Sequence, residues 1–172
     1  MPQIIIIAGP NGAGKTSFAN KHFDKPRAGL AYLNADEIAR DMAATGLPQG
    51  QRDVRAGKAM LKRMDGLVAD RASFMFETTL ASLAYARKIP AWRKRGYVVG
   101  LIYLRLPDVA TSIARVRRRV AQGGHGLPEG TIRQRFARSA DYFERHYKRL
   151  VDEWYVWDSL EGEFRLAQAW ND

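Results

Sequence analysis

The sequence contains no cysteine and no long apolar run. The missing thiols exclude a disulfide framework, a thiolate zinc site and a cysteine nucleophile, and they fit a reducing compartment. A membrane helix needs roughly 18–20 consecutive apolar residues, and residues 4–8 near the start form a run of only five with no basic segment before it. We therefore expect neither a signal peptide nor a membrane span, and a cytoplasmic location.

Histidine is also scarce, and the pattern of charge points elsewhere than to a metal cluster. The three histidines lie apart from clustered carboxylates, so they show no metal-ligand spacing. Among 172 residues, 28 Lys and Arg oppose 18 Asp and Glu, which gives a net charge of +10. This excess predicts an anionic partner without distinguishing a nucleic acid, a membrane or a small phosphorylated molecule. The length, the 46% hydrophobic content and the lack of repeats favour one domain over residues 1–172.

Strand and helix patterns alternate along the chain. Apolar or β-branched runs predict strands at 3–8, 30–34, 74–78, 97–106, 154–157 and 164–167. Helical spacing predicts helices at 16–21, 36–44, 53–69, 83–94, 109–121 and 129–150. Gly46, Pro48 and Gly50 predict a loop, and Pro90 predicts a kink or break. The order predicts an α/β fold with a mainly parallel sheet covered by helices.

A phosphate-binding loop follows the first predicted strand. Residues 9–16, GPNGAGKT, satisfy the pattern G-x-x-x-x-G-K-[ST] between a strand and a helix. The glycines let backbone N–H groups surround phosphates, and Lys15 adds a positive charge for the β- and γ-phosphates. The Thr16 hydroxyl is a candidate ligand for Mg²⁺. The pattern thus predicts binding of ATP or GTP, and the alternative is a tight turn with a chance lysine. The predicted nucleotide-binding residues are Gly9, Pro10, Asn11, Gly12, Ala13, Gly14, Lys15, Thr16 and Ser17.

Polar residues follow the second and third strands, where ligands of open α/β sheets bind. Asp36 follows the second strand, and it is a candidate base toward an acceptor hydroxyl or, alternatively, a helix N-cap. Glu77, Thr78 and Thr79 end the third strand and are candidates for substrate binding, with Glu77 a second candidate near the metal. An aspartate–glutamate pair typical of motor ATPases is lacking at this strand end, which favours a kinase.

Two basic helices flank a glycine-rich segment, and we expect residues 115–138 to form a lid. Guanidinium groups on such a lid could close on a triphosphate and stabilise the charge of the transferred group. Arg119 and Arg135 are the predicted catalytic pair because they flank the segment, while the other arginines are expected to form a solvated basic face. His125 lies among the glycines, where a lid contact and solvent exposure are equally expected.

Several motifs together resemble the zeta toxin family of P-loop kinases, especially its short chromosomal members. The matching stretches run in order through the chain: 8–16, 33–39, 76–82, 119–125, Leu127-Pro128, Ile132, Arg135-Phe136 and 155–159. The resemblance implies a three-layer, nucleoside-kinase-like P-loop fold that uses ATP or GTP with Mg²⁺. It further implies phosphorylation of the 3′-hydroxyl of a UDP-N-acetyl-amino sugar and an antitoxin partner.

The resemblance also assigns roles to individual residues. It implies that Asp36 is the base, that Lys15 and Thr16 handle the nucleotide and metal, and that Glu77 and Thr79 contact the substrate. It implies that two lid arginines hold the γ-phosphate, with Arg115, Arg118 and Arg133 as alternatives to the predicted pair.

Two other functions fit parts of the sequence. A polynucleotide or nucleoside kinase, or another nucleic-acid-directed P-loop protein, would explain the net charge. However, residues 105–149 alone hold 11 basic against 4 acidic side chains, where a triphosphate would use part of the charge, so nucleic acid is the less favoured partner. A switch ATPase without an acceptor is the second alternative.

Overall fold

The computed structural model describes residues 1–23, 30–124 and 126–171. The six strands are β1 (Gln3–Ala8), β2 (Ala31–Leu33), β3 (Phe74–Thr78), β4 (Val98–Arg105), β5 (Glu153–Ser159) and β6 (Phe164–Ala169). The α-helices are α1 (Lys15–His22), α2 (Ala35–Asp41), α3 (Gln49–Ala69), α4 (Ala84–Lys94), α5 (Val109–Ala121) and α6 (Glu129–Arg145). Short 3-10 helices η1 (Met42–Thr45) and η2 (Tyr147–Arg149) follow α2 and α6.

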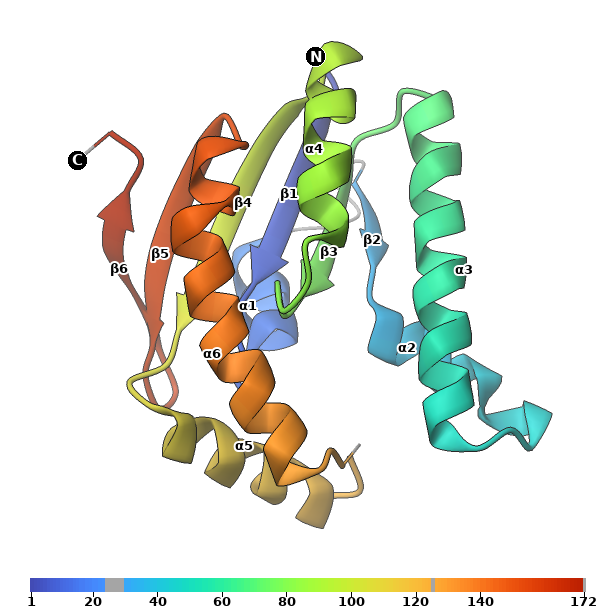
Figure 1. The fold of residues 1–172 in the computed structure, drawn as a ribbon, viewed down its shortest axis with the longest axis vertical. Coiled ribbons are helices and arrows are strands. Elements are labelled where there is room, and N and C mark those ends of the chain that lie inside the picture. Colours follow the sequence, from blue (N-terminus) through green and yellow to red (C-terminus); the bar gives the residue numbers. More distant parts are fainter. Residues whose placement is uncertain (24–29, 125, 172) are drawn as a thin grey trace.

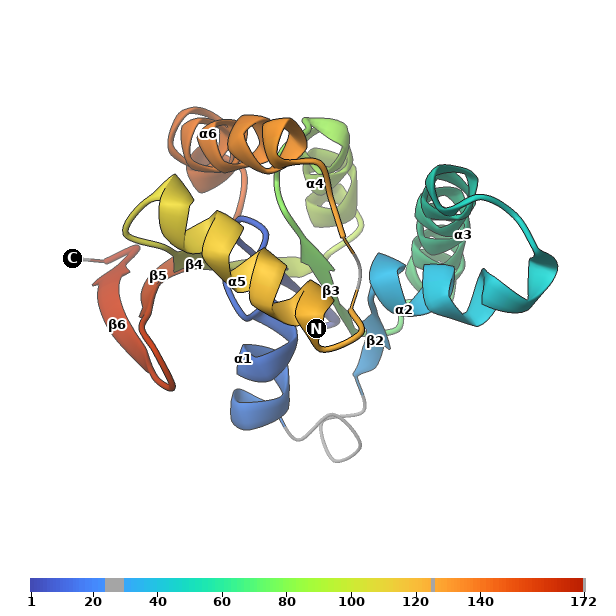
Figure 2. The same ribbon diagram turned by 90° about the horizontal axis from the view of Figure 1, so that it is seen from below.

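One sheet contains all six strands, in the order β2-β3-β1-β4-β5-β6 (Figure 1). The first five strands are parallel, and β6 returns antiparallel to β5 at the edge. Parallel pairing brings the carboxyl ends of the strands to one edge of the sheet, and α5 crosses the molecule at this end (Figures 1 and 2). The predicted α/β fold with a mainly parallel sheet is confirmed.

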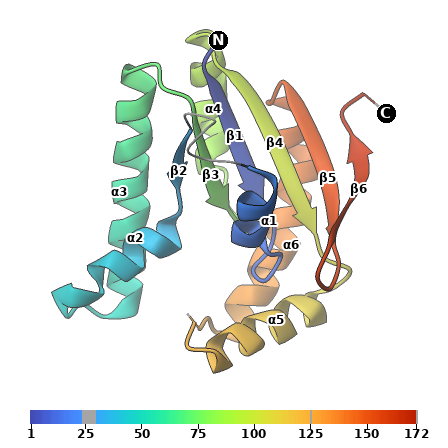
Figure 3. The same cartoon turned by 180° about the vertical axis from the view of Figure 1, so that it is seen from behind.

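Helices cover the two faces of the sheet unequally. Figure 2 shows α4 and α6 over one face and α1 against the other, and Figure 3 shows α1 from behind. On the first face, side chains of α3, α4 and α6 such as Met60, Trp92 and Phe143 form one buried core with the strands. On the second face, Phe18 of α1 packs in a smaller cluster with Leu104 of β4. The strong burial on both faces explains why β1 is an unbroken apolar run.

Several helices differ from the sequence-based expectation. The helix expected at 36–44 is α2 followed by η1, and α4 continues past Pro90, so no break occurs there. The predicted loop is present at Gly46 and Pro48 but ends before Gly50, because α3 begins at Gln49 and the carbonyl of Pro48 accepts the N–H groups of Gln51 and Arg52 at 3.0 and 3.1 Å. Proline and glycine in a first helical turn are tolerated, so they mark this helix start and not a longer loop. The predicted helix 129–150 is divided at His146, where α6 ends and η2 follows.

The C-terminal hairpin of β5 and β6 supplies acidic partners to arginines of other elements. Arg93 of α4 pairs with Asp152 at 2.6 Å, Arg105 of β4 with Asp158 at 2.7 Å, and Arg118 of α5 with Glu161 at 2.9 Å. Arg118 and Glu161 are largely exposed, and exposed pairs of this kind each contribute about 0–1 kcal/mol to stability. Among the described helices, none is long and apolar enough to span a membrane.

Candidate active site

The phosphate-binding loop forms a tight turn between β1 and α1. Gly9, Gly12 and Gly14 have φ values of 147°, 80° and 82°, a region that favours glycine. At Gly9 a side chain is also excluded by space, because a Cβ atom would lie 2.5 Å from the carbonyl oxygen of Leu104. The backbone conformations at these positions explain the glycine spacing of the motif. The turn that they form directs the loop backbone and the start of α1 toward the same space.

Lys15 is folded back onto the phosphate-binding loop. Its Nζ donates hydrogen bonds to the carbonyl oxygens of Gly9 and Pro10 at 3.0 and 3.2 Å. Burial lowers the pKa of Lys15, and the nearby carboxylates of Glu77 and Asp36 oppose that shift. A bound phosphate would give this ammonium group a stronger partner than two carbonyl oxygens.

A cavity of about 600 Å³ opens at the carboxyl end of the sheet, beside this loop. The predicted site residues that it brings together are Asn11, Gly12, Gly14, Lys15, Thr16, Ser17, Asp36, Glu77, Thr78, Thr79, Arg119 and Arg135. Gly9, Pro10 and Ala13 are buried and shape the loop from behind without lining the cavity. The predicted nucleotide, acceptor and lid residues therefore share one space.

Glu77 is held by two hydroxyl groups, one on each carboxylate oxygen. Thr16 Oγ1 donates to Glu77 Oε2 at 3.1 Å, and the Tyr32 hydroxyl donates to Oε1. Asn34 Nδ2 donates to both Thr16 Oγ1 and the Tyr32 hydroxyl at 3.4 Å. Burial raises the pKa of Glu77, while the bond from Tyr32 and the charge of Lys15 lower it.

This group of oxygens meets the requirements of Mg²⁺. Among the described residues there is no cluster of three or more histidine or acidic side chains that could hold a metal alone. Mg²⁺ in nucleotide sites is usually bound by one or two protein oxygens, with phosphates and waters completing the shell. Thr16 Oγ1 and Glu77 Oε2 supply hard oxygen ligands at the mouth of the phosphate-binding loop.

Asp36 lies in the first turn of α2 and is exposed to the cavity. The alternative role as N-cap is wrong, because Asn34 is the cap and its Oδ1 accepts the backbone N–H of Asp36 at 2.9 Å. The carboxylate of Asp36 is thus available to a ligand. Because β2 pairs in parallel with β3, the helix that follows β2 begins at the carboxyl end of the sheet and places Asp36 at the same edge as Lys15.

Helix α5, part of the predicted lid, is fastened to the phosphate-binding loop. Ser112 Oγ donates to the carbonyl oxygen of Asn11 at 2.5 Å. Arg115 donates to the carbonyl oxygen of Gly12 at 3.3 Å and to the hydroxyl and carbonyl oxygens of Ser159 at 2.8 and 3.1 Å. Because Arg119 lies one helical turn after Arg115, the same face of α5 carries it to the cavity.

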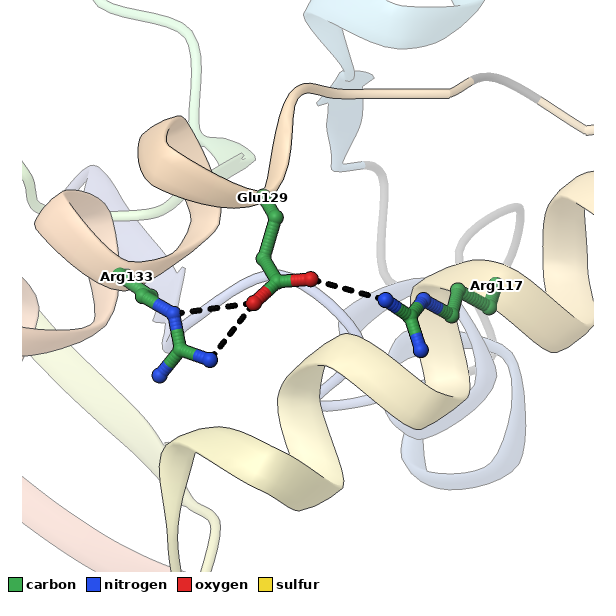
Figure 4. A network of polar contacts seen from close by, with 3 residues as sticks. All are labelled: Arg117, Glu129 and Arg133. Atoms are coloured by element: carbon green, nitrogen blue, oxygen red, sulfur yellow. Dashed lines mark hydrogen bonds and ion pairs between the residues drawn. The ribbon is translucent and has the colours of Figure 1, made fainter.

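The remaining lid arginines are mostly engaged with acids outside the cavity. Glu129, the first residue of α6, accepts hydrogen bonds from Arg117 at 2.8 Å and from Arg133 at 2.6 Å (Figure 4). These two arginines lower the pKa of Glu129, Arg133 more strongly. This carboxylate joins α5 to α6 across the glycine-rich segment, in which His125 lies outside the described residues.

A family model described as an AAA domain matches residues 4–145, which include the phosphate-binding loop, the predicted acceptor-side residues, and helices α5 and α6. The chain belongs to the AAA domain family. An uncharacterized protein of Haemophilus influenzae is similar to this AAA domain, with 26% identity over 136 residues, 78% of this chain and 92% of the relative.

Solved structures show where the fold of this AAA domain recurs. A chain of the AvrRxo1-ORF1:AvrRxo1-ORF2 complex is similar with a TM-score of 0.78 and 18% identity, over 98% of this chain and 58% of that one. The chain thus spans little more than half of that longer protein. A chain of the PezAT chromosomal toxin–antitoxin system of Streptococcus pneumoniae has a TM-score of 0.71 and 14% identity, covering 100% and 73%. A gluconokinase from Sinorhizobium meliloti 1021 has a TM-score of 0.53 and 16% identity, covering 92% and 83%. These similarities show a P-loop kinase-like fold.

The cavity of this AAA domain also contains residues that the sequence pattern did not single out. Asp53 reaches it from α3, Ser82 from the segment between β3 and α4, and Tyr85 from the first turn of α4. Arg115 had been only an alternative to the predicted lid pair, and it lines the cavity as well. Asp53 had no sequence signal beyond its place at an expected helix start. The sequence signal for Ser82 is that it lies in one of the stretches that resemble the zeta toxin kinases.

Proposed function

We propose that this protein is a kinase that transfers the γ-phosphoryl group of ATP or GTP to a hydroxyl group of a small molecule. The observation that carries the proposal is the single cavity, in which the phosphate-binding loop faces Asp36 and two lid arginines. A motor or switch ATPase usually carries an aspartate–glutamate pair at a neighbouring strand end, whereas here Glu77 is followed by Thr78 and Thr79, and the second carboxylate, Asp36, follows another strand. The kinase-like fold agrees with this assignment.

In the proposed reaction, the loop amides and Lys15 bind the β- and γ-phosphates of the donor. Thr16 and Glu77 would hold Mg²⁺, which, when bound, neutralises charge on the phosphates. Asp36 orients the acceptor hydroxyl and takes its proton as the oxygen attacks. Arg119 and Arg135 stabilise the charge on the transferred group, and closure of the lid excludes water that would otherwise hydrolyse the donor.

For the acceptor, we propose the 3′-hydroxyl of a UDP-N-acetyl-amino sugar, as in the zeta toxins that the sequence resembles. The similarity to a chain of the PezAT toxin–antitoxin system supports this choice. Glu77, Thr78 and Thr79 would contact the sugar together with Asp36. We further propose a cytoplasmic, one-domain protein over residues 1–172 with a lid at about 115–138, inhibited by an antitoxin protein.

A screen of nucleotide sugars with ATP and Mg²⁺ tests the proposal, with mass spectrometry to detect the gain of a phosphoryl group. We expect one sugar class to be phosphorylated by the wild type and none by the Lys15→Ala variant. Rapid ATP hydrolysis without any acceptor, unchanged in Asp36→Asn, would instead identify a switch ATPase. A product on RNA or DNA ends, with an affinity that falls steeply with salt, would identify a polynucleotide kinase.

A further inference from the structure

Tyr32 contacts the predicted metal site from behind. It lies in β2, a strand of three residues at the edge of the sheet, and pairs in register with Met75 of β3. Its side chain is half-buried and is outside the set of described residues that line the cavity. The hydroxyl nevertheless donates to Glu77 Oε1, on the side opposite to Thr16. Tyr32 therefore touches a cavity residue without touching a ligand.

The bond from Tyr32 fixes the orientation of the Glu77 carboxylate. An ionised carboxylate has two equivalent oxygens and can rotate between partners unless both are held. With Oε1 bound to Tyr32, Oε2 is directed to Thr16 Oγ1, the candidate Mg²⁺ ligand, at 3.1 Å. Without the Tyr32 hydroxyl, only the single bond from Thr16 would direct the carboxylate. That hydrogen bond would have to rearrange when Thr16 Oγ1 binds a metal ion.

Asn34 connects the same network to the candidate base. Its Nδ2 donates to the Tyr32 hydroxyl and to Thr16 Oγ1, and its Oδ1 caps the helix that carries Asp36. The Tyr32 hydroxyl thus lies between Glu77 and the start of α2. Buried polar networks of this kind restrict their members to one arrangement when every member is satisfied.

We propose that Tyr32 is a positioning residue that holds Glu77 in the orientation in which it receives the Mg²⁺–nucleotide complex, directly or through a metal-bound water. The inference rests on the proposed kinase function and adds a role for a residue behind the site. It predicts that loss of the hydroxyl weakens the metal-dependent part of nucleotide binding. The metal-independent part, which the loop amides and Lys15 provide, remains.

The test compares Tyr32→Phe with Tyr103→Phe. Tyr103 is the matched control because its buried hydroxyl makes a hydrogen bond with Ser139 Oγ at 3.1 Å, within the core and outside the cavity lining. Both variants lose one tyrosine hydroxyl. For each protein, the melting temperature is measured alone, with ADP, and with ADP plus Mg²⁺. The Mg²⁺ concentration that gives half-maximal transfer from ATP is also measured.

We expect both free variants to melt about 2–4 °C below the wild type, as for the loss of one hydrogen bond in a chain of this size. ADP alone is expected to raise the melting temperature of all three proteins equally. Added Mg²⁺ is expected to stabilise the wild type and Tyr103→Phe further, but not Tyr32→Phe. The half-saturating Mg²⁺ concentration of Tyr32→Phe is expected to rise about 10–100-fold, the usual effect of removing a partner of a metal ligand.

Two results would overturn the inference while leaving the kinase function intact: a wild-type Mg²⁺ response in Tyr32→Phe, or an equal loss in Tyr103→Phe. The second result would mean that any weakening of the core has this effect. The absence of any nucleotide-dependent shift in the wild type refutes the proposed kinase function, and the role of Tyr32 falls with it.

Discussion

Replacing Asp36 with asparagine is expected to stop phosphoryl transfer while leaving the protein almost as stable as before. The two effects separate because the helix cap is Asn34, whereas the proposed base is Asp36. Asn34 caps α2, and the carboxylate of Asp36 is exposed to the cavity in the first turn. A change at Asp36 therefore removes the proposed proton acceptor and keeps the cap, whereas a change at Asn34 removes the cap.

The magnitudes follow from these positions. A carboxylate in the first turn of a helix contributes about 0.3–1 kcal/mol through the helix dipole, so Asp36→Asn is expected to lower the free energy of unfolding by less than about 1 kcal/mol. Loss of a cap costs about 0.5–2 kcal/mol, and Asn34→Ala also removes the bonds to Thr16 and Tyr32. A general base contributes about 10²–10⁴-fold to rate, so Asp36→Asn is expected to lose that factor in kcat.

Urea unfolding of both variants and of the wild type measures stability, and ATP binding in the presence of Mg²⁺ measures the integrity of the donor site. Phosphoryl transfer is measured on the acceptor found in the nucleotide-sugar screen. Wild-type turnover in Asp36→Asn would refute the assignment of the base. A loss of stability in Asp36→Asn as large as that in Asn34→Ala would refute the division of tasks, because it would show that Asp36 supports the helix.

Three further predictions concern the lid, the loop and the buried carboxylate. Arg119→Ala and Arg135→Ala are each expected to lower kcat about 10³–10⁵-fold. Arg117→Ala is the control, because Arg117 pairs with Glu129 outside the cavity lining, and this variant is expected to keep most activity. Equal losses in all three variants would contradict the choice of Arg119 and Arg135. Gly9→Ala is expected to cost about 2–5 kcal/mol of unfolding free energy in urea titrations, from the 2.5 Å approach to a carbonyl oxygen and the unfavourable φ. Because burial raises the pKa of Glu77, the folded protein binds its proton more tightly, and stability from this group declines as the pH rises above the ordinary value of 4.5. The stability of Glu77→Gln relative to the wild type is therefore expected to increase with pH in that range, and a pH-independent difference would contradict it.

The sequence was sufficient for the parts of the site whose geometry is local. The phosphate-binding loop is a continuous motif, and its glycine positions match the three positive φ values. Asp36 and Glu77 could be placed because residues that follow parallel strands meet at one edge of the sheet. Neither inference needs knowledge of how distant elements pack.

The parts that could not be predicted depend on distant pairing. The arginines of 115–138 look alike in the sequence, but their surroundings differ: Glu129 and Glu161 engage Arg117, Arg118 and Arg133, whereas Arg115, Arg119 and Arg135 line the cavity. Asp53 reaches the cavity only because η1 and the start of α3 place it there. Tyr32 belongs to a short apolar strand, where a tyrosine is expected to pack and gives no sign of a hydrogen bond to Glu77.

Acidic side chains of the C-terminal segment already pair with arginines that a polyanion would otherwise contact. Residues 150–172 carry six acidic side chains and one arginine, and three of the acids already bind arginines of α4, β4 and α5. Phosphate groups of RNA or DNA would compete with a carboxylate at each of these three arginines, whereas Lys15, Arg119 and Arg135 line the cavity beside the phosphate-binding loop. Neutralising Asp158 and Glu161 would leave Arg105 and Arg118 open to other anions, whereas Asp152 also accepts the backbone N–H of Val99 at 2.8 Å and supports the fold. The hairpin thereby reduces the number of arginines open to a polyanion, in agreement with the proposed small anionic ligand.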